Sequence, residues 1–512
     1  MRVVHALLGG AVGLAWLVLP GGTISDVDPV PVPPGPAAVA PTAQERQEPS
    51  PVDLILPIAV AGATAALAGY AYLRRTRRAR TRTTPGGEVS ARPPVASPAE
   101  SERQARAALV AADDCVRTSG EEIAAAEAQL GAEAVEPFAR ALRAAQAELS
   151  AAFAIRLRYE QGVPEDEAAR RQALVGVVGR CAEAGRRLDA EADAFDRMRG
   201  LERGTGGALE TAEARFQELA GRTGWAEESL GALRERFASS AVAPVLGFVE
   251  QAKNRLVFAT TQLNAARQRA GSGDERRAVR HLRAAEGALA QADVFVSGVE
   301  RLGTELRAAA ERIPAVLTDA EAQVAVPRAW LTGGTTAVPP ARMPAGELHA
   351  RLAHADAVLA AVREESARGS YNPVEALRRV ARAVEPLGVA AVGEVPAGAR
   401  LAARSATGAA EDFVATHRGA VGAQARTRLA EAVRLLAEGD AATADDLARE
   451  ARELAERDVR THGNPYAGTA EHASGLAGAV LGGVLLADEP DGGPPASFGG
   501  PTTRARLRMP QG

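Results

Sequence analysis

Few of the side chains that enzymes use for chemistry recur at a spacing that would bring them together. His349 and His354 are five residues apart in ELHARLAHAD and would point about 140° away from each other on a helix. They would not share a face to hold a metal ion. The chain shows no phosphate-binding loop, no nucleophile elbow and no paired carboxylates in a supporting context. We therefore expect no catalytic, cofactor or metal site, and a protein that is not an enzyme.

The two cysteines and the paired charges point to packing and solvation. Cys181 falls on an apolar stripe of helical spacing, so we expect it to pack in a core. Cys115 and Cys181 both lie on the side of the chain that we place in the cytosol, where free thiols are expected. Pairs of Glu and Arg four residues apart, such as Glu102 and Arg106, are typical of solvated helix faces.

Composition favours closely packed, alanine-rich helices. Only 4% of the 512 residues are aromatic, which argues against a conventional large core of mixed sheet and helix. The formal net charge is −4, and six arginines at residues 74–82 contribute +6, so the other residues together carry −10. This acidic balance makes a poor general binder of nucleic acid, and we expect no such partner.

An uncharged apolar run predicts a transmembrane helix at residues 54–73. Its twenty residues are enough to cross roughly 30 Å of hydrocarbon. The residues expected to meet the lipid headgroups are two tyrosines and the six arginines after them, namely Tyr70, Tyr72, Arg74, Arg75, Arg77, Arg78, Arg80 and Arg82. Aromatic rings favour the interface, and an arginine cluster without acids marks the cytoplasmic side. The long part of the chain that follows is therefore expected to be cytoplasmic, with the lipid bilayer as a partner.

The residues before this span are expected to lie outside the cytoplasm. Residues 1–25 have the basic start and apolar run of a secretory signal, either cleaved or retained as a signal anchor. Residues 26–53 are rich in Pro, Ala and Val, which is typical of a disordered tether. The expected localisation is the cell membrane. The chain would be single-pass after signal cleavage and two-pass if the signal is retained.

A basic flank and linker at residues 74–96 lead into a helical bundle at residues 97–325. Ser97-Pro98-Ala99-Glu100 has the pattern of a capping box with Pro at the first helical position, so a helix should start here. A coiled-coil seam is indicated by apolar residues every seven positions with small residues between them, namely Leu109, Ala112, Val116, Ser119, Ile123, Ala126 and Leu130.

Breaks divide the start of this bundle into three helices. The first break is at Gly131 and Pro137, and the second is at Gly162-Val163-Pro164. Three helices joined by short loops predict an antiparallel bundle. The expected fold class is thus all-α: a single transmembrane helix and a long alanine-rich antiparallel helical bundle or coiled coil, with disordered linkers and tail.

The second half of the chain is expected to be divided by a linker. Residues 326–344 contain Gly-Gly and Pro-Pro breakers, and helices should continue over residues 345–461. Turns near Gly271, Gly369 and Gly439 each have Asp or Asn close by and indicate a helix ending and another beginning.

A Gly/Pro-rich tail is expected at residues 462–512. It contains a short apolar patch at residues 474–487, too short to span a membrane alone, which would dock on the bundle or lie at the membrane surface. The composition of residues 488–512 predicts disorder.

The order of these parts resembles actinobacterial membrane proteins of the TPM-domain type. The resemblance rests on residues 54–82, on SERQARAALVAADD (residues 101–114), and on HGNPYAG, LAGAVLGGVLL and SFGG near the end. In that family a signal peptide and an extracytoplasmic TPM domain precede one span and a long cytoplasmic helical region. Here the residues between the signal and the span are too few for such a domain. Any phosphatase or other activity of the TPM domain would therefore have no residues to carry it.

These features predict a membrane-anchored cytoplasmic helical scaffold or protein-interaction module. Its partners would be proteins that contact the helical surfaces. Small residues four apart in the span, at Ala61, Ala65 and Gly69, would also permit a homodimer. The competing hypothesis is a degenerate or cryptic enzyme related to TPM-domain phosphatase-like proteins.

Overall fold

The computed structural model of the protein describes residues 97–331, 344–389, 393–462 and 497–508. These residues belong to one compact unit, 94–512, and the secondary structure in the described ranges is helical, which confirms the predicted all-α class. The signal, the tether, the transmembrane helix and the basic flank, which were predicted at residues 1–96, lie outside the described residues. So does the apolar patch at 474–487.

Three helices form a bundle at the start of the unit: α3 (Pro98–Leu130), α4 (Ala132–Glu160) and α5 (Glu167–Arg199). Ser97 caps α3 as predicted, since its Oγ atom accepts the N–H of Glu100 at 3.2 Å. The seam residues of α3 are buried, except Leu130 at the end of the helix, which is 40% exposed. The expected antiparallel three-helix bundle is therefore present, and we call it the first bundle.

The breaks predicted at Gly131 and at Gly162-Val163-Pro164 are confirmed, since they lie between α3 and α4 and between α4 and α5, but other prolines do not end a helix. Pro137 lies inside α4, which begins five residues earlier at Ala132. Pro314 and Pro327 lie inside α9 (Glu275–Leu331), so helix continues past residue 326, where a linker was expected to begin. Packing explains this result, because Phe138, which follows Pro137, and Pro327 itself are buried. The energy of that burial offsets the missing backbone hydrogen bond.

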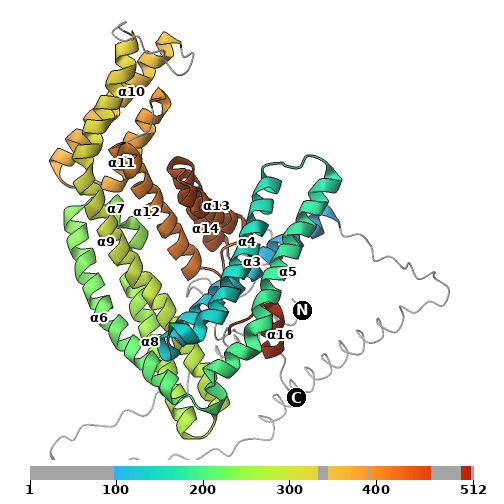
Figure 1. The fold of residues 1–512 in the computed structure, drawn as a ribbon. Helices are drawn as coiled ribbons and strands as arrows, with labels where there is room; N and C mark the ends of the chain where they lie inside the picture. Colours follow the sequence, from blue (N-terminus) through green and yellow to red (C-terminus); the bar gives the residue numbers. More distant parts are fainter. Residues whose placement is uncertain (1–96, 332–343, 390–392, 463–496, 509–512) are drawn as a thin grey trace, which may run out of the picture. The chain divides into compact units, whose positions relative to one another are not determined.

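A long arm is built around α9, whose 57 residues extend roughly 85 Å. It packs with α6 (Gly206–Arg236) and α8 (Phe248–Gly271), as Figure 1 shows. The short elements η1 (Leu201–Arg203), α7 (Ser239–Val242) and η2 (Ala243–Val245) connect these helices. The core at the start of the arm consists mainly of Ala and Leu from η1, α6, α8 and α9. Trp225 of α6 is 77% exposed.

The remaining helices pack on the far half of α9 and on each other. They are α10 (Ala345–Arg368), α11 (Pro373–Val384) with η3 (Glu385–Leu387), α12 (Glu394–Thr416), α13 (Ala423–Glu438) and α14 (Ala441–Thr461). One apolar core joins α6 and α9 to α10, α11 and α12. Residues on both sides of the predicted 326–344 linker therefore share a core. A smaller core joins α12, α13 and α14.

The three predicted Gly-containing turns are confirmed, and each is followed by a capped helix. The side chains of Asp274, Asn372 and Asp440 accept backbone N–H groups three residues later, at 3.1–3.2 Å. Asp and Asn are favoured at this position because their side-chain oxygens satisfy the free N–H groups of a helix start.

Part of the tail predicted to be disordered is folded. Residues 497–500 and α16 (Pro501–Arg508) lie against α5 and α3 of the first bundle (Figure 1). Phe498 is fully buried in that bundle's core. The composition of the tail predicted disorder because it has little apolar surface of its own, but here the first bundle supplies the core.

Candidate functional site

The residues predicted to contact lipid lie outside the part of the chain that the structure describes. They are Tyr70, Tyr72, Arg74, Arg75, Arg77, Arg78, Arg80 and Arg82. Among the helices in the described ranges, none combines the length and the apolar character that a membrane crossing requires.

The histidines and cysteines hold structural positions. His349, on α10, bonds the carbonyl of Ala345 through Nδ1 at 2.8 Å. Cys115 and Cys181 are free and buried in the core of the first bundle, as expected for Cys181. Burial raises the pKa of Cys115 to about 11 and that of Cys181 to about 12, so both stay protonated at neutral pH. Within the described ranges, no group of three or more His, Cys, Asp or Glu side chains is placed to hold a metal ion.

Arg426 of α13 is a deeply buried charge that joins the first bundle to the C-terminal helices. Its Nη1 atom donates to Asp113 at 2.5 Å and to Asp114 at 2.7 Å, both on α3. Its Nε atom donates to the Val421 carbonyl at 3.1 Å. Burial opposes ionisation of Asp113, but Arg117 and Arg426 outweigh it and hold the pKa of that carboxyl below its usual value. Asp113 is therefore ionised and paired with Arg426 at neutral pH.

A second buried cluster joins α3, α5 and α9. The Nη2 atom of Arg199 donates to both carboxylate oxygens of Glu286, at 2.7 and 2.8 Å, and Arg283 pairs with Asp196 at 2.9 Å. Glu122 sits 4.0 Å from Arg283, and its Oε2 atom receives no hydrogen bond. Burial raises the pKa of Glu122 to about 7. Its carboxyl group is therefore partly protonated at neutral pH.

Two further pairs join helices across the second half of the unit. Arg301 of α9 binds Asp412 of α12 at 2.6 and 3.2 Å. Arg378 of α11 binds Asp445 of α14 at 2.6 and 2.8 Å. In both pairs each carboxylate oxygen accepts one N–H of the guanidinium, which fixes the relative rotation of the two helices.

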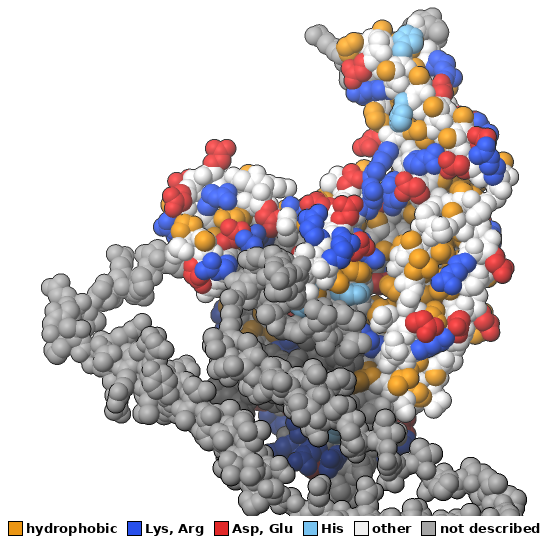
Figure 2. Space-filling view, turned by 180° about the vertical axis from the view of Figure 1, so that it is seen from behind, with side chains coloured by type: hydrophobic (Ala, Val, Ile, Leu, Met, Phe, Trp, Pro, Cys, Tyr) orange, Lys and Arg blue, Asp and Glu red, His pale blue; other side chains and the backbone are white. Residues whose placement is uncertain are grey.

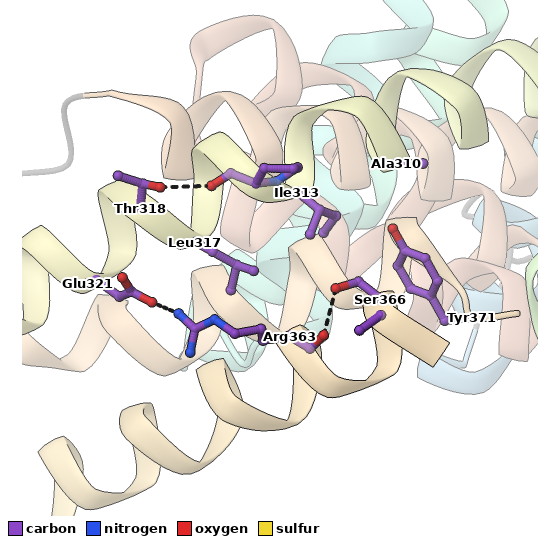
Figure 3. Close-up of a pocket in the computed structure, with 10 residues that line it drawn as sticks. Ala310, Ile313, Leu317, Thr318, Glu321, Arg363, Ser366 and Tyr371 are labelled. Atoms are coloured by element: carbon purple, nitrogen blue, oxygen red, sulfur yellow. Dashed lines mark hydrogen bonds and ion pairs between the residues drawn. The ribbon is translucent and has the colours of Figure 1, made fainter. Parts of the chain in front are cut away.

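A pocket of about 480 Å³ opens between α9, α10 and the turn before α11 (Figure 3). Ile313 and Leu317 of α9 and Tyr371 provide apolar surface, and Glu321 pairs with Arg363 across it. Two of the hydroxyls that line it donate to backbone carbonyls: that of Thr318 to Pro314 at 3.0 Å and that of Ser366 to Arg363 at 2.9 Å.

The Thr318 and Ser366 hydroxyls are therefore not paired with a base, and burial raises the pKa of the Tyr371 hydroxyl. Sequence reasoning missed the pocket because its lining residues come from three separate segments.

Sequence comparison finds relatives whose names carry the designation UPF0603. The chain is 32% identical over 423 residues to two Mycobacterium tuberculosis proteins, UPF0603 protein MT2410 of strain CDC 1551 / Oshkosh and UPF0603 protein Rv2345 of strain ATCC 25618 / H37Rv. No protein-family model matches the chain, and no solved structure matches it. The alignment covers 77% of this chain and 62% of each relative, so the chain spans less than two thirds of these UPF0603 proteins, to which it is similar in sequence.

Proposed function

We propose that the protein is a membrane-anchored helical scaffold whose cytoplasmic unit presents helix surfaces to protein partners. The observation that carries this proposal is that the charged side chains in the interior pair with each other between helices. Arg426, Arg199, Arg301 and Arg378 each pair with a carboxylate on a different helix. Catalytic acids and bases need contact with a substrate, whereas these groups are arranged to hold helices together.

The membrane anchor of this proposal rests on the sequence. Residues 54–73 have the length and apolar character of a span, and the arginines at residues 74–82 favour the cytoplasmic side. The resemblance to TPM-domain-type membrane proteins supports the same order of span and cytoplasmic helices. The basic flank would also hold the start of the helical unit near anionic lipid.

The charge distribution of the unit suits protein partners better than nucleic acid. Figure 2 shows positive and negative side chains interspersed along the limb that carries α10 and α11. A nucleic-acid site would instead gather positive charge along one face. Apolar side chains also stand exposed on the arm, including Trp225 at 77% and Val257 at 68%. Exposed aromatic residues are enriched among those that anchor protein contacts.

Protease protection tests the proposed topology. In intact spheroplasts, added protease should leave residues 97–508 undigested, and detergent should make them accessible. A cytosolic protein serves as the protected control, and an exported protein as the digested one. Digestion of the helical unit in intact spheroplasts would place it outside and end the proposal.

Photocrosslinking tests the scaffold role itself. A crosslinking residue at Trp225, in the intact membrane protein, should give the same adducts in repeated preparations, and a crosslinker at the exposed Arg234, on the opposite side of the same helix, provides the control. A chain without residues 54–82 should lose adducts that depend on the membrane. If both positions gave the same adducts, or none, the arm would have no specific partner surface.

A further inference from the structure

The docked segment, which we define as residues 497–508, contacts the first bundle through the aromatic ring of Phe498. This ring stacks on Phe195 with centroids 4.5 Å apart and meets the edge of Phe138 at 5.9 Å. Phe498 and Ser497 are both fully buried. Three aromatic rings thus close one end of the first bundle, and the segment supplies one of them.

Asp189 of α5 fixes the backbone of the docked segment. Its carboxylate accepts four hydrogen bonds: from the N–H groups of Gly500 at 2.9 Å, Thr502 at 3.3 Å and Thr503 at 2.9 Å, and from the Thr503 hydroxyl at 2.6 Å. Burial opposes ionisation of Asp189, but the bonds from Thr503 and Thr502 outweigh it and lower the pKa of this carboxyl. Asp189 therefore acts as the helix cap of α16 from a different helix.

Glycines on both sides allow the docked segment to approach α5 closely. A Cβ atom at Gly185 would lie 2.7 Å from the Pro501 ring, and a Cβ at Gly500 would lie 2.3 Å from the Gly185 carbonyl oxygen. Gly499 has φ of +138°, a conformation that favours glycine. Alanine at Gly185 or Gly500 therefore could not be accommodated without moving the segment.

Gly185 also shows that α5 is adapted to this contact. Glycine in a helix interior is less stable than alanine by roughly 0.5–1 kcal/mol. The docked segment explains why glycine occurs at position 185, because the ring of Pro501 occupies the space that a larger side chain would need. Gly179, on the same helix, has no atom within 4 Å of its Cβ position and provides a natural comparison.

We propose that the first bundle contains a peptide-recognition site for a Ser-Phe-Gly-Gly-Pro-Thr segment, and that this site accepts the segment from a second copy of the chain as well as from its own. The socket is formed by Phe138, Gly185, Asp189 and Phe195 together with Ser119, whose hydroxyl oxygen accepts the Gly499 N–H at 3.2 Å. The segment that binds there contributes a buried Phe, two glycines and a capped helix start. All of these features lie within the segment's own sequence, so the socket can recognise them without the rest of the chain. This inference goes beyond the scaffold proposal and does not depend on the membrane anchor.

The length of chain before the docked segment permits exchange between copies. Residues 463–496 separate it from the end of α14, and a chain of that length can reach at most roughly 110 Å. Attachment to α14 therefore does not force the segment into the socket of its own copy. When an element and its binding site both belong to one chain, exchange between two identical chains preserves every contact.

A peptide-binding experiment on the full chain tests the recognition site. Gly500→Ala should displace the chain's own segment and leave the socket vacant. A fluorescent peptide of residues 495–508 should then bind this variant, measured by anisotropy, and should bind wild type at least about tenfold more weakly because the tethered segment competes. A peptide with Phe498→Ala should bind about 100-fold more weakly or not at all.

Controls identify the socket as the place of binding. Adding Gly185→Ala to the Gly500→Ala chain should abolish peptide binding, whereas adding Gly179→Ala should leave it unchanged. A Gly500→Ala chain that keeps its helical circular dichroism but binds no peptide would overturn the proposal. Loss of the cooperative fold in this variant would also overturn it, because the segment would then be a fixed part of the core.

Mixing two defective full-length chains tests the second copy as donor. The Gly185→Ala chain has a blocked socket and an intact segment, and the Gly500→Ala chain has the opposite defect. Each alone should be a monomer with respect to this contact, and their mixture should give one-to-one dimers by light scattering. Mixtures of Gly179→Ala with Gly500→Ala should give fewer such dimers, because the Gly179→Ala segment occupies its own socket. Peptide binding without mixed dimers would overturn exchange between copies.

Discussion

The first bundle and the arm show two ways in which this chain builds a helical core. The core at the start of the arm draws on residues between Leu201 and Ala292, which are neighbours along the chain. The core of the first bundle is closed by Ala423 and Phe498, which lie hundreds of residues away. Local periodicity is therefore enough to describe the start of the arm, whereas the first bundle depends on contacts that no local pattern contains.

The ion pairs of the arm and of the first bundle differ in the same way as their cores. On the arm, Arg222 pairs with Asp293 and Glu300 at its partly exposed surface. In the first bundle, Asp113 pairs with Arg426 in the interior, across 313 positions of sequence. Exposed pairs contribute little to stability, but removal of one partner from a buried pair leaves an uncompensated charge. Distant residues should therefore control the stability of the first bundle more than that of the arm.

The largest expected effect comes from Arg426→Met. This change leaves Asp113 buried without its partner on α13 and should destabilise the unit by about 3–5 kcal/mol. Hydrogen exchange should locate the loss of protection in α3 and α13. Arg434→Met, on the exposed face of the same helix, should have far less effect. Equal effects of the two changes would show that the buried cluster does not join the first bundle to α13.

Phe498→Ala should have the next largest effect. It removes a fully buried ring from the core of the first bundle and should cost about 3 kcal/mol. Protection from hydrogen exchange should fall in α3 and α5 and remain unchanged in α6 and α8. Trp225→Ala, which removes a larger but exposed ring from the arm, is the matched control. Loss of protection throughout the arm would contradict the independence of the two cores.

The sequence predicted what depends on neighbours along the chain. The cap at Ser97, the stripe that contains Cys181 and the turns at Gly271, Gly369 and Gly439 all follow from residues within a few positions of each other. Their physical causes, capping and helical periodicity, act over that distance.

Interactions over long sequence distances could not be predicted in this way. The composition of the tail suggests disorder because glycine and proline cannot build a core, but Phe498 enters a core made by other residues. Pro137 and Pro327 suggest helix ends, but burial of the residues around them outweighs the lost hydrogen bond. To predict the docked segment from the sequence, one would have to test which distant side chains can fill the core of the first bundle.

Glu122 offers a test through pH at the junction between the two regions. Its pKa is raised from 4.5 to about 7 in the folded protein, so the folded state holds this proton more tightly than the unfolded chain. Stability from this group is therefore greatest below pH 4.5 and is lost as the pH rises to about 7. Glu122→Gln should remove this decline and stabilise the protein at pH 8 by on the order of 2 kcal/mol. The measurement is urea unfolding from pH 5 to pH 8.

The exposed Glu127 of α3 provides the control for this pH profile. Glu127→Gln should leave the slope of stability against pH as in wild type, because this side chain stands in solvent. If Glu122→Gln and wild type gave parallel profiles, the carboxyl would titrate equally in the folded and unfolded chains, and burial at the α3, α5 and α9 junction would not govern it.

The smallest expected effect distinguishes two glycines of α5. Gly179→Ala should stabilise the first bundle by roughly 0.5–1 kcal/mol, since alanine is the better helix former and nothing lies within 4 Å of the added methyl group. Gly185→Ala gains the same helix propensity but drives a methyl group against Pro501 and so displaces the docked segment. The two changes should therefore shift the melting temperature in opposite directions. Equal stabilisation by both would mean that the segment adds nothing to the first bundle, whose core would then be as local as that of the arm.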